Sequence, residues 1–349
     1  VRCIDKQAGI YAVESDPGIF KNKYNILSDL GKIMERQLTM TKEEFEKSFV
    51  KGKVDPELHV TDDHHRFMKL NNNICLRSQI DCRSVDADGK PKVFEIKTRG
   101  TAPIRYDLAN YSQYLDYVVS ETKGKHSSFE REYYDLIRGG FMKYSFQLKI
   151  GRMDGAFVAY HNTLENFGFE YIKTKEIEKR MFGSNQAADL AFVCCSKLIT
   201  TLLDEIIKDL SHENYSLLRI GYYADGINHR MTIFSEVFYD LDSWTSKDLI
   251  DETESLRHEY DFYSKVWKDR PRKVFKYIFN VAVYVNGVRQ TTPDYRIGPN
   301  DMVEMKYSLE KVGKAPMWDY MNFLHEAYKF DSNTISMNYI GTWIKELNH

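Results

Sequence analysis

The sequence predicts an α/β fold in which helices flank a mixed β-sheet and a C-terminal α+β extension follows. Two observations predict it. Short segments that alternate apolar and polar side chains, as strands do, are interleaved with longer segments whose apolar residues recur at helical spacing. Hydrophobic residues make up 42% of the 349 residues, which is enough for a sizeable core.

The N-terminal part predicts two helices and a loop. Residues 25–38 carry an apolar stripe at helical spacing. Thr41 and Glu44 form a capping box that opens a second, short helix. Residues 51–70 are polar, and we interpret them as a loop. No cysteine or histidine stands at zinc-finger spacing from the histidines of this segment, which are therefore interpreted as loop residues: His59, His64 and His65.

Strands and helices alternate along the rest of the chain. A β-hairpin is expected at about 74–98. The other expected helices are 107–121, 128–150, 185–209, 316–329 and 338–347, and the other expected strands are 155–162, 167–172 and segments within 215–240 and 274–308. A solvated pattern at 175–183 predicts a boundary, which divides the chain into residues 1–175 and residues 176–349.

The expected hairpin carries the main functional signal. A turn with Asp-Gly at its tip, Asp86 to Lys90, joins its two strands. Residues two apart in a strand point to one face, so Glu95 and Lys97 share a face and Ile96 points the other way. Pairing of the strands brings Asp81 beside Glu95. Two carboxylates that hold Mg²⁺, with an ammonium that steadies the attacking water, are suited to phosphodiester hydrolysis.

Two simpler interpretations of the hairpin are a surface ion pair and a calcium loop. An isolated Glu-x-Lys pair is most often a surface ion pair on an edge hairpin. Here Phe94 and Ile96 flank Glu95, as a buried central strand requires. Asp86 and Asp88 suggest calcium, but an EF-hand loop needs further oxygen ligands, and the positions that would supply them hold Lys90 and Val93.

A second segment contains a similar sequence motif. Pro293 and Asp294 precede Glu304 and Lys306, which literally match the pattern of the PD-(D/E)XK nucleases. The residues between them form a turn-rich connection, and no glutamine-bearing helix directly follows. We therefore favour the hairpin of Asp81 and Glu95 as the site.

Other residues are candidates for the same site. Glu35 interrupts the polar side of the first helix and is a candidate third carboxylate, although such a residue is often an exposed helical glutamate. Gln147, on a later helix, can orient the lysine or a phosphate, although it can equally be a surface amide. Four cations are candidates for phosphate binding: Arg99, Arg105, Lys149 and Arg152. The alternative interpretation is that they belong to a solvated face of the protein. The basic run 265–273, with Trp267 inside, is a weaker candidate for single-strand binding.

Composition limits the class of protein. The formal net charge of −2 excludes a bulk polycation, so a nucleic-acid surface must be a local patch. Five cysteines without framework spacing argue against a disulfide-rich secreted domain. No apolar run reaches membrane-spanning length and no signal peptide opens the chain. Because it opens on valine, we expect a fragment or a processed form.

Several strings of the chain resemble the fungal mitochondrial RNA 5′-end-processing protein family of the yeast petite series. The resemblance is dense from about residue 25 to 172 and thinner beyond. The strings that carry it are Leu30–Arg36, Ile80-Asp81, Phe94–Arg99, Pro103–Arg105, Phe129–Asp135 and Gly151–Thr163.

The resemblance implies a nuclease of the PD-(D/E)XK superfamily, with a restriction-endonuclease-like core in residues 1–175 and a structural or RNA-binding region in residues 176–349. It implies a 5′-to-3′ exoribonuclease that processes and degrades mitochondrial RNA with Mg²⁺, or Mn²⁺ in its place. The superfamily's first aspartate usually follows a proline, a place that Ile80 takes here. The implied catalytic set is Glu35, Asp81, Glu95, Lys97 and Gln147, and the implied metal ligands are Glu35, Asp81, Glu95 and the Ile96 carbonyl.

The same resemblance implies a mitochondrial location, in the matrix or at the inner membrane, where peripheral association needs no transmembrane helix. The expected partners are a single-stranded RNA with a 5′ end and the mitochondrial RNA polymerase or RNA-degradation machinery. Two other classes stay open: a non-catalytic RNA-binding or polymerase-associated factor, and a RecB-type DNA exonuclease. The residues alone do not separate RNA from DNA, since that needs a contact to the 2′-hydroxyl.

Overall fold

The computed structural model describes the chain in two compact units. The described residues are 1–14, 26–53, 64–70, 74–225, 230–239, 273–292, 296–298, 300–316, 319–320 and 322–323. One unit comprises residues 24–196 with 336–349, and the other residues 1–23 with 197–335. The predicted helices at 316–329 and 338–347, the basic run 265–272, His59 and Asp294 lie wholly or largely outside the described residues.

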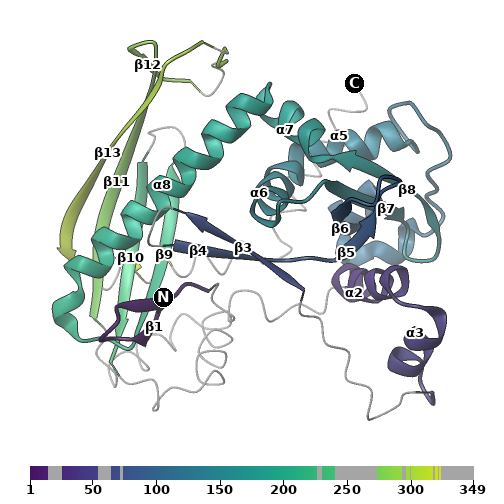
Figure 1. Cartoon of the computed structure of the whole chain (residues 1–349), viewed down its shortest axis with the longest axis horizontal. Coiled ribbons are helices and arrows are strands. Elements are labelled where there is room, and N and C mark those ends of the chain that lie inside the picture. Colours follow the sequence, from purple (N-terminus) through teal and green to yellow (C-terminus); the bar gives the residue numbers. More distant parts are fainter. Residues whose placement is uncertain are drawn as a thin grey trace. The chain divides into compact units, whose positions relative to one another are not determined.

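A four-stranded mixed sheet organises the unit of residues 24–196 (Figure 1). Its order is β5 (Cys82–Val85), β6 (Pro91–Gly100), β7 (Gly155–His161) and β8 (Asn166–Lys173). The β5–β6 and β7–β8 pairs are antiparallel, whereas β6 and β7 are parallel. The mixed α/β architecture expected from the sequence is thus present.

Three helices pack on one face of this sheet: α5 (Phe129–Gly139), α6 (Phe141–Gly151) and α7 (Thr174–Phe182). They enclose a core with Val93 of β6, and its fully buried members include Leu136, Phe141, Leu148, Val158, Tyr160 and Ile177. The sequence placed a boundary after residue 175, but Ile177 of α7 is buried in this core. The two units instead divide within α8 (Asn185–Asp209), at residue 196.

The helix α2 (Ile26–Thr39) lies against β6. A Cβ atom at Gly31 would come within 2.8 Å of the Thr98 Oγ1 atom, and one at Gly100 within 2.9 Å of Leu27 Cδ2. The two glycines therefore permit this close approach. The expected capping box of Thr41 and Glu44 begins α3 (Lys42–Phe49), with both of its hydrogen bonds present.

Residues 65–70, expected as a loop, instead form a strand. β3 (His65–Leu70) pairs antiparallel with β4 (Ile74–Gln79) in a two-stranded sheet. We refer to this β3–β4 pair as the ribbon. Its alternating burial comes from packing against α6, a tertiary contact that the polar composition of the segment does not indicate.

The prediction of a helix at 107–121 is also wrong. The chain forms a short helix α4 (Ala102–Tyr106) and a 3₁₀ helix η1 (Leu108–Tyr114), and no regular helix continues to residue 121. The Asp107 carboxylate accepts hydrogen bonds from Asn110 and from the Tyr114 hydroxyl, which competes with regular helical bonding. The segment 128–150 divides into α5 and α6 near Gly140.

The other unit is built on a seven-stranded antiparallel sheet. Its strands are β1 (Arg2–Asp5), β2 (Ile10–Ala12), β9 (Leu217–Asp225), β10 (Arg230–Phe238), β11 (Lys273–Val285), β12 (Val288–Gln290) and β13 (Val303–Lys314). A turn at Asn286-Gly287 joins β11 to β12, with positive φ at both residues. The short 3₁₀ helix η2 (Ser211–Glu213) follows α8, and β1 and β2 had no counterpart in the sequence prediction.

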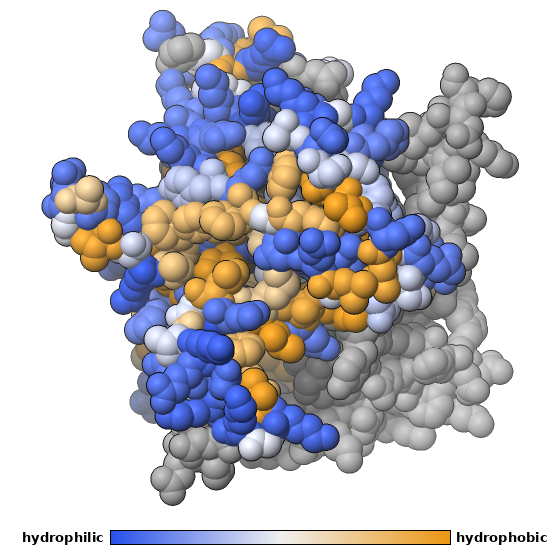
Figure 2. Space-filling model, turned by 90° about the vertical axis from the view of Figure 1, so that its right-hand side faces the viewer, coloured by the Kyte–Doolittle hydropathy of each residue, from blue (hydrophilic) through white to orange (hydrophobic). Residues whose placement is uncertain are grey.

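Apolar side chains are not confined to the two cores. On the face drawn in Figure 2, they form a broad area that hydrophilic side chains cross and border. Exposed apolar side chains of the residues 24–196 unit include Val85, Leu164 and Phe169. Exposed apolar area alone therefore does not single out one functional surface here.

A buried ion network fixes the end of β6. The Arg105 guanidinium of α4 donates to Glu132 at 2.5 Å and to Asp135 at 3.0 Å, and it also donates to the Gly100 carbonyl. Both carboxylates are almost fully buried, and Glu132 accepts a further bond from the Ala102 N–H at 2.8 Å. The network ties the segment after β6 to α5.

Removing Arg105 should therefore destabilise the fold. Arg105→Ala leaves Glu132 and Asp135 buried without the Arg105 guanidinium, although Asp135 keeps its ion pair with Arg131 at 3.5 Å, and we expect a loss of about 3–5 kcal/mol in the free energy of unfolding. Chemical denaturation followed by circular dichroism measures it. The control is Arg138→Ala, an exposed arginine of α5 that should change stability by less than about 0.5 kcal/mol. Equal stability of the Arg105 variant and wild type would contradict a structural role.

Candidate functional site

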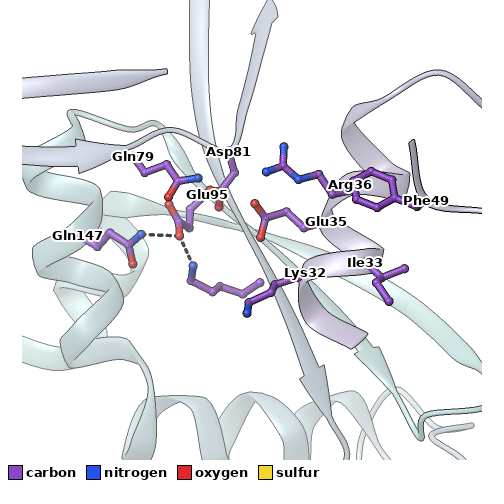
Figure 3. Close-up of a pocket in the computed structure, with 10 residues that line it drawn as sticks. Lys32, Ile33, Glu35, Arg36, Phe49, Gln79, Asp81, Glu95 and Gln147 are labelled. Carbon is purple, nitrogen blue, oxygen red and sulfur yellow. Dashed lines mark hydrogen bonds and ion pairs between the residues drawn. The ribbon is translucent and has the colours of Figure 1, made fainter. Parts of the chain in front are cut away.

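A cavity of about 560 Å³ opens in the unit of residues 24–196. Side chains from α2, α3, the end of β4, β6 and α6 line it (Figure 3). The lining residues are Lys32, Ile33, Glu35, Arg36, Phe49, Gln79, Asp81, Glu95, Lys97 and Gln147. The structure thus brings together all five members of the predicted catalytic set.

Asp81 stands in the short link between β4 and β5. The preceding Ile80 is buried in the core and donates its N–H to the His64 carbonyl at 2.8 Å, which anchors the link. The Asp81 carboxylate accepts a hydrogen bond from the Ile96 N–H at 2.9 Å. Because the N–H and C=O of a strand residue leave on the same side, the Ile96 carbonyl also lies on the side of Asp81.

Glu95 is the most buried group of the cavity, with a side chain only 1% exposed. Its Oε1 atom accepts hydrogen bonds from the Lys97 ammonium and, at 2.5 Å, from the Gln147 amide. Its Oε2 atom is buried and has no hydrogen-bond partner among the described residues. Burial raises the pKa of Glu95 to about 7; Lys97 opposes this rise, and Asp81 adds to it.

Lys97 points to the same side of β6 as Glu95. Burial acts to lower its pKa, but Glu95, Asp81 and Tyr144 together outweigh burial and the pKa is raised. The ammonium lies 5.9 Å from the centre of the Tyr144 ring on α6, so it also has an aromatic neighbour. The lysine is therefore held as a cation beside the two carboxylates.

Glu35 approaches Asp81 from the other side, on α2 (Figure 3). Burial raises the pKa of the Glu35 carboxyl, and the nearby Asp81 raises it further. Asp81 thus interacts with both Glu35 and Glu95. Carboxyl groups whose pKa is raised by burial and by a neighbouring carboxylate, as at Glu35 and Glu95, are typical of functional sites.

The donor set suits a hard cation. Within the described residues, no three cysteine, histidine, aspartate or glutamate side chains form a ready-made metal centre. The buried Glu95 Oε2 atom nevertheless lacks a donor, Asp81 is a neighbour of the Glu95 carboxyl group, and the Ile96 carbonyl leaves β6 on the side of Asp81. Carboxylate and carbonyl oxygens are the ligands that Mg²⁺ prefers.

The four arginines and lysines predicted to bind phosphate lie elsewhere. Arg105 belongs to the buried network with Glu132 and Asp135, and Lys149 pairs with Glu178 at 2.6 Å and Asp189 at 2.5 Å. The cavity lining includes neither of them, nor Arg99 and Arg152.

The other two cations are placed differently from one another. Arg99 follows Lys97 on β6, where burial and then Arg105 lower its pKa, and its buried Nε atom has no partner among the described residues. Arg152 is exposed and ends α6 with a left-handed φ of 47°.

Sequence reasoning missed the other side of the cavity. Lys32 and Arg36 of α2 line it within one turn of Glu35, and Ile33 and Phe49 add apolar surface. Phe49 is 42% exposed and stands 5.3 Å from the ring of its helix neighbour Phe45. Helical spacing was the signal available for this side, because Lys32 stands three residues before Glu35 and four before Arg36, and residues three and four apart share a face.

The alternative motifs do not form comparable sites in the described residues. Glu304 and Lys306 face solvent on β13 as an ion pair at 3.6 Å, with side chains 56% and 59% exposed. Asp86 holds its own turn instead of an ion, accepting the N–H groups of Asp88 at 3.0 Å and Lys90 at 2.8 Å. His65 lies on β3, and His64 directly precedes it.

Comparisons with known proteins identify the family of the chain. The sequence model of a family described as mitochondrial protein Pet127 matches residues 1–204. The mitochondrial mRNA degradation protein pet127 of Schizosaccharomyces pombe is 30% identical over 257 residues, which cover 72% of this chain and 48% of that protein. PET127 of Saccharomyces cerevisiae, provisionally named a component of the mitochondrial translation system, is 35% identical over 176 residues.

The Saccharomyces match covers 50% of this chain and 20% of its relative. The chain thus matches about half of the length of the first relative and a fifth of the second. In the described part of the chain, no helix combines the length and the hydropathy needed to cross a bilayer. The family match covers more than half of the chain, including every residue of the cavity, and the chain therefore belongs to the Pet127 family of mitochondrial proteins.

Proposed function

We propose that this chain is a metal-dependent exoribonuclease of the PD-(D/E)XK type that processes and degrades mitochondrial RNA. The observation that carries the proposal is the cluster of Asp81, Glu95 and Lys97 on one cavity wall, with one buried Glu95 oxygen left without a donor. The name of the Schizosaccharomyces relative supports RNA degradation. The 5′-to-3′ direction rests on the family resemblance of the sequence.

The residues divide the chemistry among them. Asp81, Glu95 and the Ile96 carbonyl would hold Mg²⁺, or Mn²⁺ in its place, and Glu35 would complete the set. When bound, the ion would supply charge neutralisation at the phosphate and a water of lowered pKa. Lys97 donates hydrogen bonds to the attacking water or to a phosphate oxygen, and Gln147 holds Glu95 in place through its 2.5 Å hydrogen bond.

The other wall of the cavity suits the rest of a nucleotide. Lys32 and Arg36 supply positive charge for a phosphate. Ile33 and Phe49 supply an exposed apolar surface on which a base can lie. These residues take the phosphate-binding role that the sequence assigned to Arg105 and Lys149, both of which are held in ion pairs. The expected partners are a single-stranded RNA and the RNA-degradation machinery or RNA polymerase of the mitochondrion.

Metal dependence is the first test. Time courses on 5′-labelled and 3′-labelled RNA should show degradation that EDTA stops and that Mg²⁺ or Mn²⁺ restores, because the carboxylates act through a bound cation. Short products should be released from the 5′ end first. Full activity in EDTA would contradict the metal mechanism, faster cleavage of DNA would favour a RecB-type enzyme, and RNA binding without cleavage would favour the non-catalytic class.

The second test separates the two motifs. Asp81→Asn or Lys97→Ala should lower the cleavage rate by about 10²-fold or more, with RNA affinity nearly unchanged, because these groups act on the scissile phosphate. Glu304→Gln is the matched control, since Glu304 also precedes a lysine by two residues on a strand but faces solvent. Cleavage assays with each variant decide it. An inactive Glu304 variant beside an active Asp81 variant would move the site to β13.

The third test uses stability instead of activity. Because the pKa of Glu95 is raised above its usual 4.5 to about 7, the wild type loses stability as the pH rises through this window. Glu95→Gln removes that loss, because glutamine does not ionise. Without metal, the free energy of unfolding of the variant should exceed that of the wild type at pH 8 by on the order of 2 kcal/mol. At pH 4.5 the variant should have no such advantage.

Thermal unfolding with and without Mg²⁺ completes this third test. Added Mg²⁺ should raise the unfolding temperature of the wild type, because a ligand that binds only the folded state stabilises it. The same Mg²⁺ should have little effect on the Glu95→Gln variant. An equal increase in both proteins would show that Glu95 is not a metal ligand.

A further inference from the structure

The ribbon has two faces of different character. The register pairs Phe67 with Arg77 and Lys69 with Cys75, so these four residues share one face. The residues between them belong to the opposite face, which packs against α6. On that packed face, the Arg66 guanidinium donates to the carbonyl groups of Gly151 at 3.1 Å and Arg152 at 2.8 Å. Among the described residues, the ribbon is therefore fixed on α6 through this face.

The other face, which we name the outward face, is open to solvent. It comprises His65, Phe67, Lys69, Cys75, Arg77 and Gln79. Phe67 is 62% exposed, and Lys69 and Arg77 are exposed as well. None of the six is acidic, and neither Lys69 nor Arg77 forms an ion pair with another described residue. In a chain of net charge −2, this face is a local basic surface with an aromatic ring in it.

The outward face begins at the candidate site. Gln79, its last member on β4, lines the cavity together with Asp81. A strand rises about 3.3 Å per residue, so the face extends roughly 17 Å from Gln79 to the far end of β4. A polymer whose end lies in the cavity can therefore continue along Arg77 and Phe67 to Lys69.

We propose that the outward face of the ribbon binds the single-stranded RNA that leads into the cavity. The proposal rests on the proposed function for the identity of the polymer. Lys69 and Arg77 contact phosphates, and Phe67 stacks on a base, which is how proteins hold single strands without reading their sequence. A peptide partner would find only two cations and one ring here. A polynucleotide matches the charge and the ring together.

The test measures RNA binding in EDTA, where cleavage does not interfere. The variant Phe67→Ala/Arg77→Glu is compared with wild type on RNA of about 12 nucleotides and on a dinucleotide, by fluorescence anisotropy at several salt concentrations. The control is Phe169→Ala/Lys173→Glu, which changes an exposed aromatic and an exposed cation on β8 of the same unit. Thermal unfolding verifies that each variant is folded.

The ribbon variant should bind the longer RNA about tenfold or more weakly, with a much smaller change for the dinucleotide, which does not extend along the ribbon. Lys69→Ala/Arg77→Ala should reduce the salt slope of binding by about 1.4, because each single-strand phosphate contact contributes about 0.7. It also serves as the second variant if the first does not fold. The control should bind like wild type.

Two results separate the ribbon from the proposed function. Unchanged affinity and salt slope in both ribbon variants would overturn the ribbon proposal, even if the wild type cleaves RNA. Weaker binding in the ribbon variants, with a wild type that cleaves no RNA under any metal, would leave the ribbon as an RNA surface and overturn the nuclease.

Discussion

The burial of the Glu95 carboxylate is the constraint on which the rest of the site depends. A carboxylate that is 1% exposed loses its hydration, which costs several kcal/mol unless neighbours replace the lost water. Lys97 from the same strand and Gln147 from α6 satisfy one of its oxygens. The other oxygen is buried without a donor among the described residues, and Asp81 is a further carboxylate beside Glu95. The sheet and α6 must therefore pack in one arrangement for this charge to be tolerated, and that arrangement defines the cavity.

The parts of the site that local sequence predicts are those governed by strand periodicity. Alternation along β6 is a property of the backbone, so the shared face of Glu95 and Lys97 follows from their spacing alone. The turn at Asp86 and the capping box at Thr41 are equally local, and both are present. Glu35 and Gln147 join the site through tertiary packing of α2 and α6, for which the sequence offered only their helical setting and a family resemblance.

The cations show why the remainder was not predictable. In the sequence, nothing distinguishes Arg105 and Lys149 from cations that bind phosphate. In the structure they pair with carboxylates between 27 and 40 residues away: Glu132 and Asp135 for Arg105, and Glu178 and Asp189 for Lys149. Charge counts do not identify such pairs, because only the packed structure shows which carboxylates reach which cations. The same holds for β3, which ends a largely polar segment and forms a strand through pairing with β4 and contact with α6.

The hydrogen bond from the Ile96 N–H to Asp81 affects which substitutions β6 tolerates at position 96. The donor is a backbone group, so the orientation of Asp81 does not depend on the chemical nature of the side chain at position 96. Among the common amino acids, only proline lacks this N–H. Mutational tolerance at position 96 is thus set by the packing of its buried side chain, while the neighbouring carboxylate stays aligned through many exchanges. Because a backbone group orients the Asp81 carboxylate, substitution of the side chain at position 96 by any residue except proline does not remove the hydrogen bond that holds it.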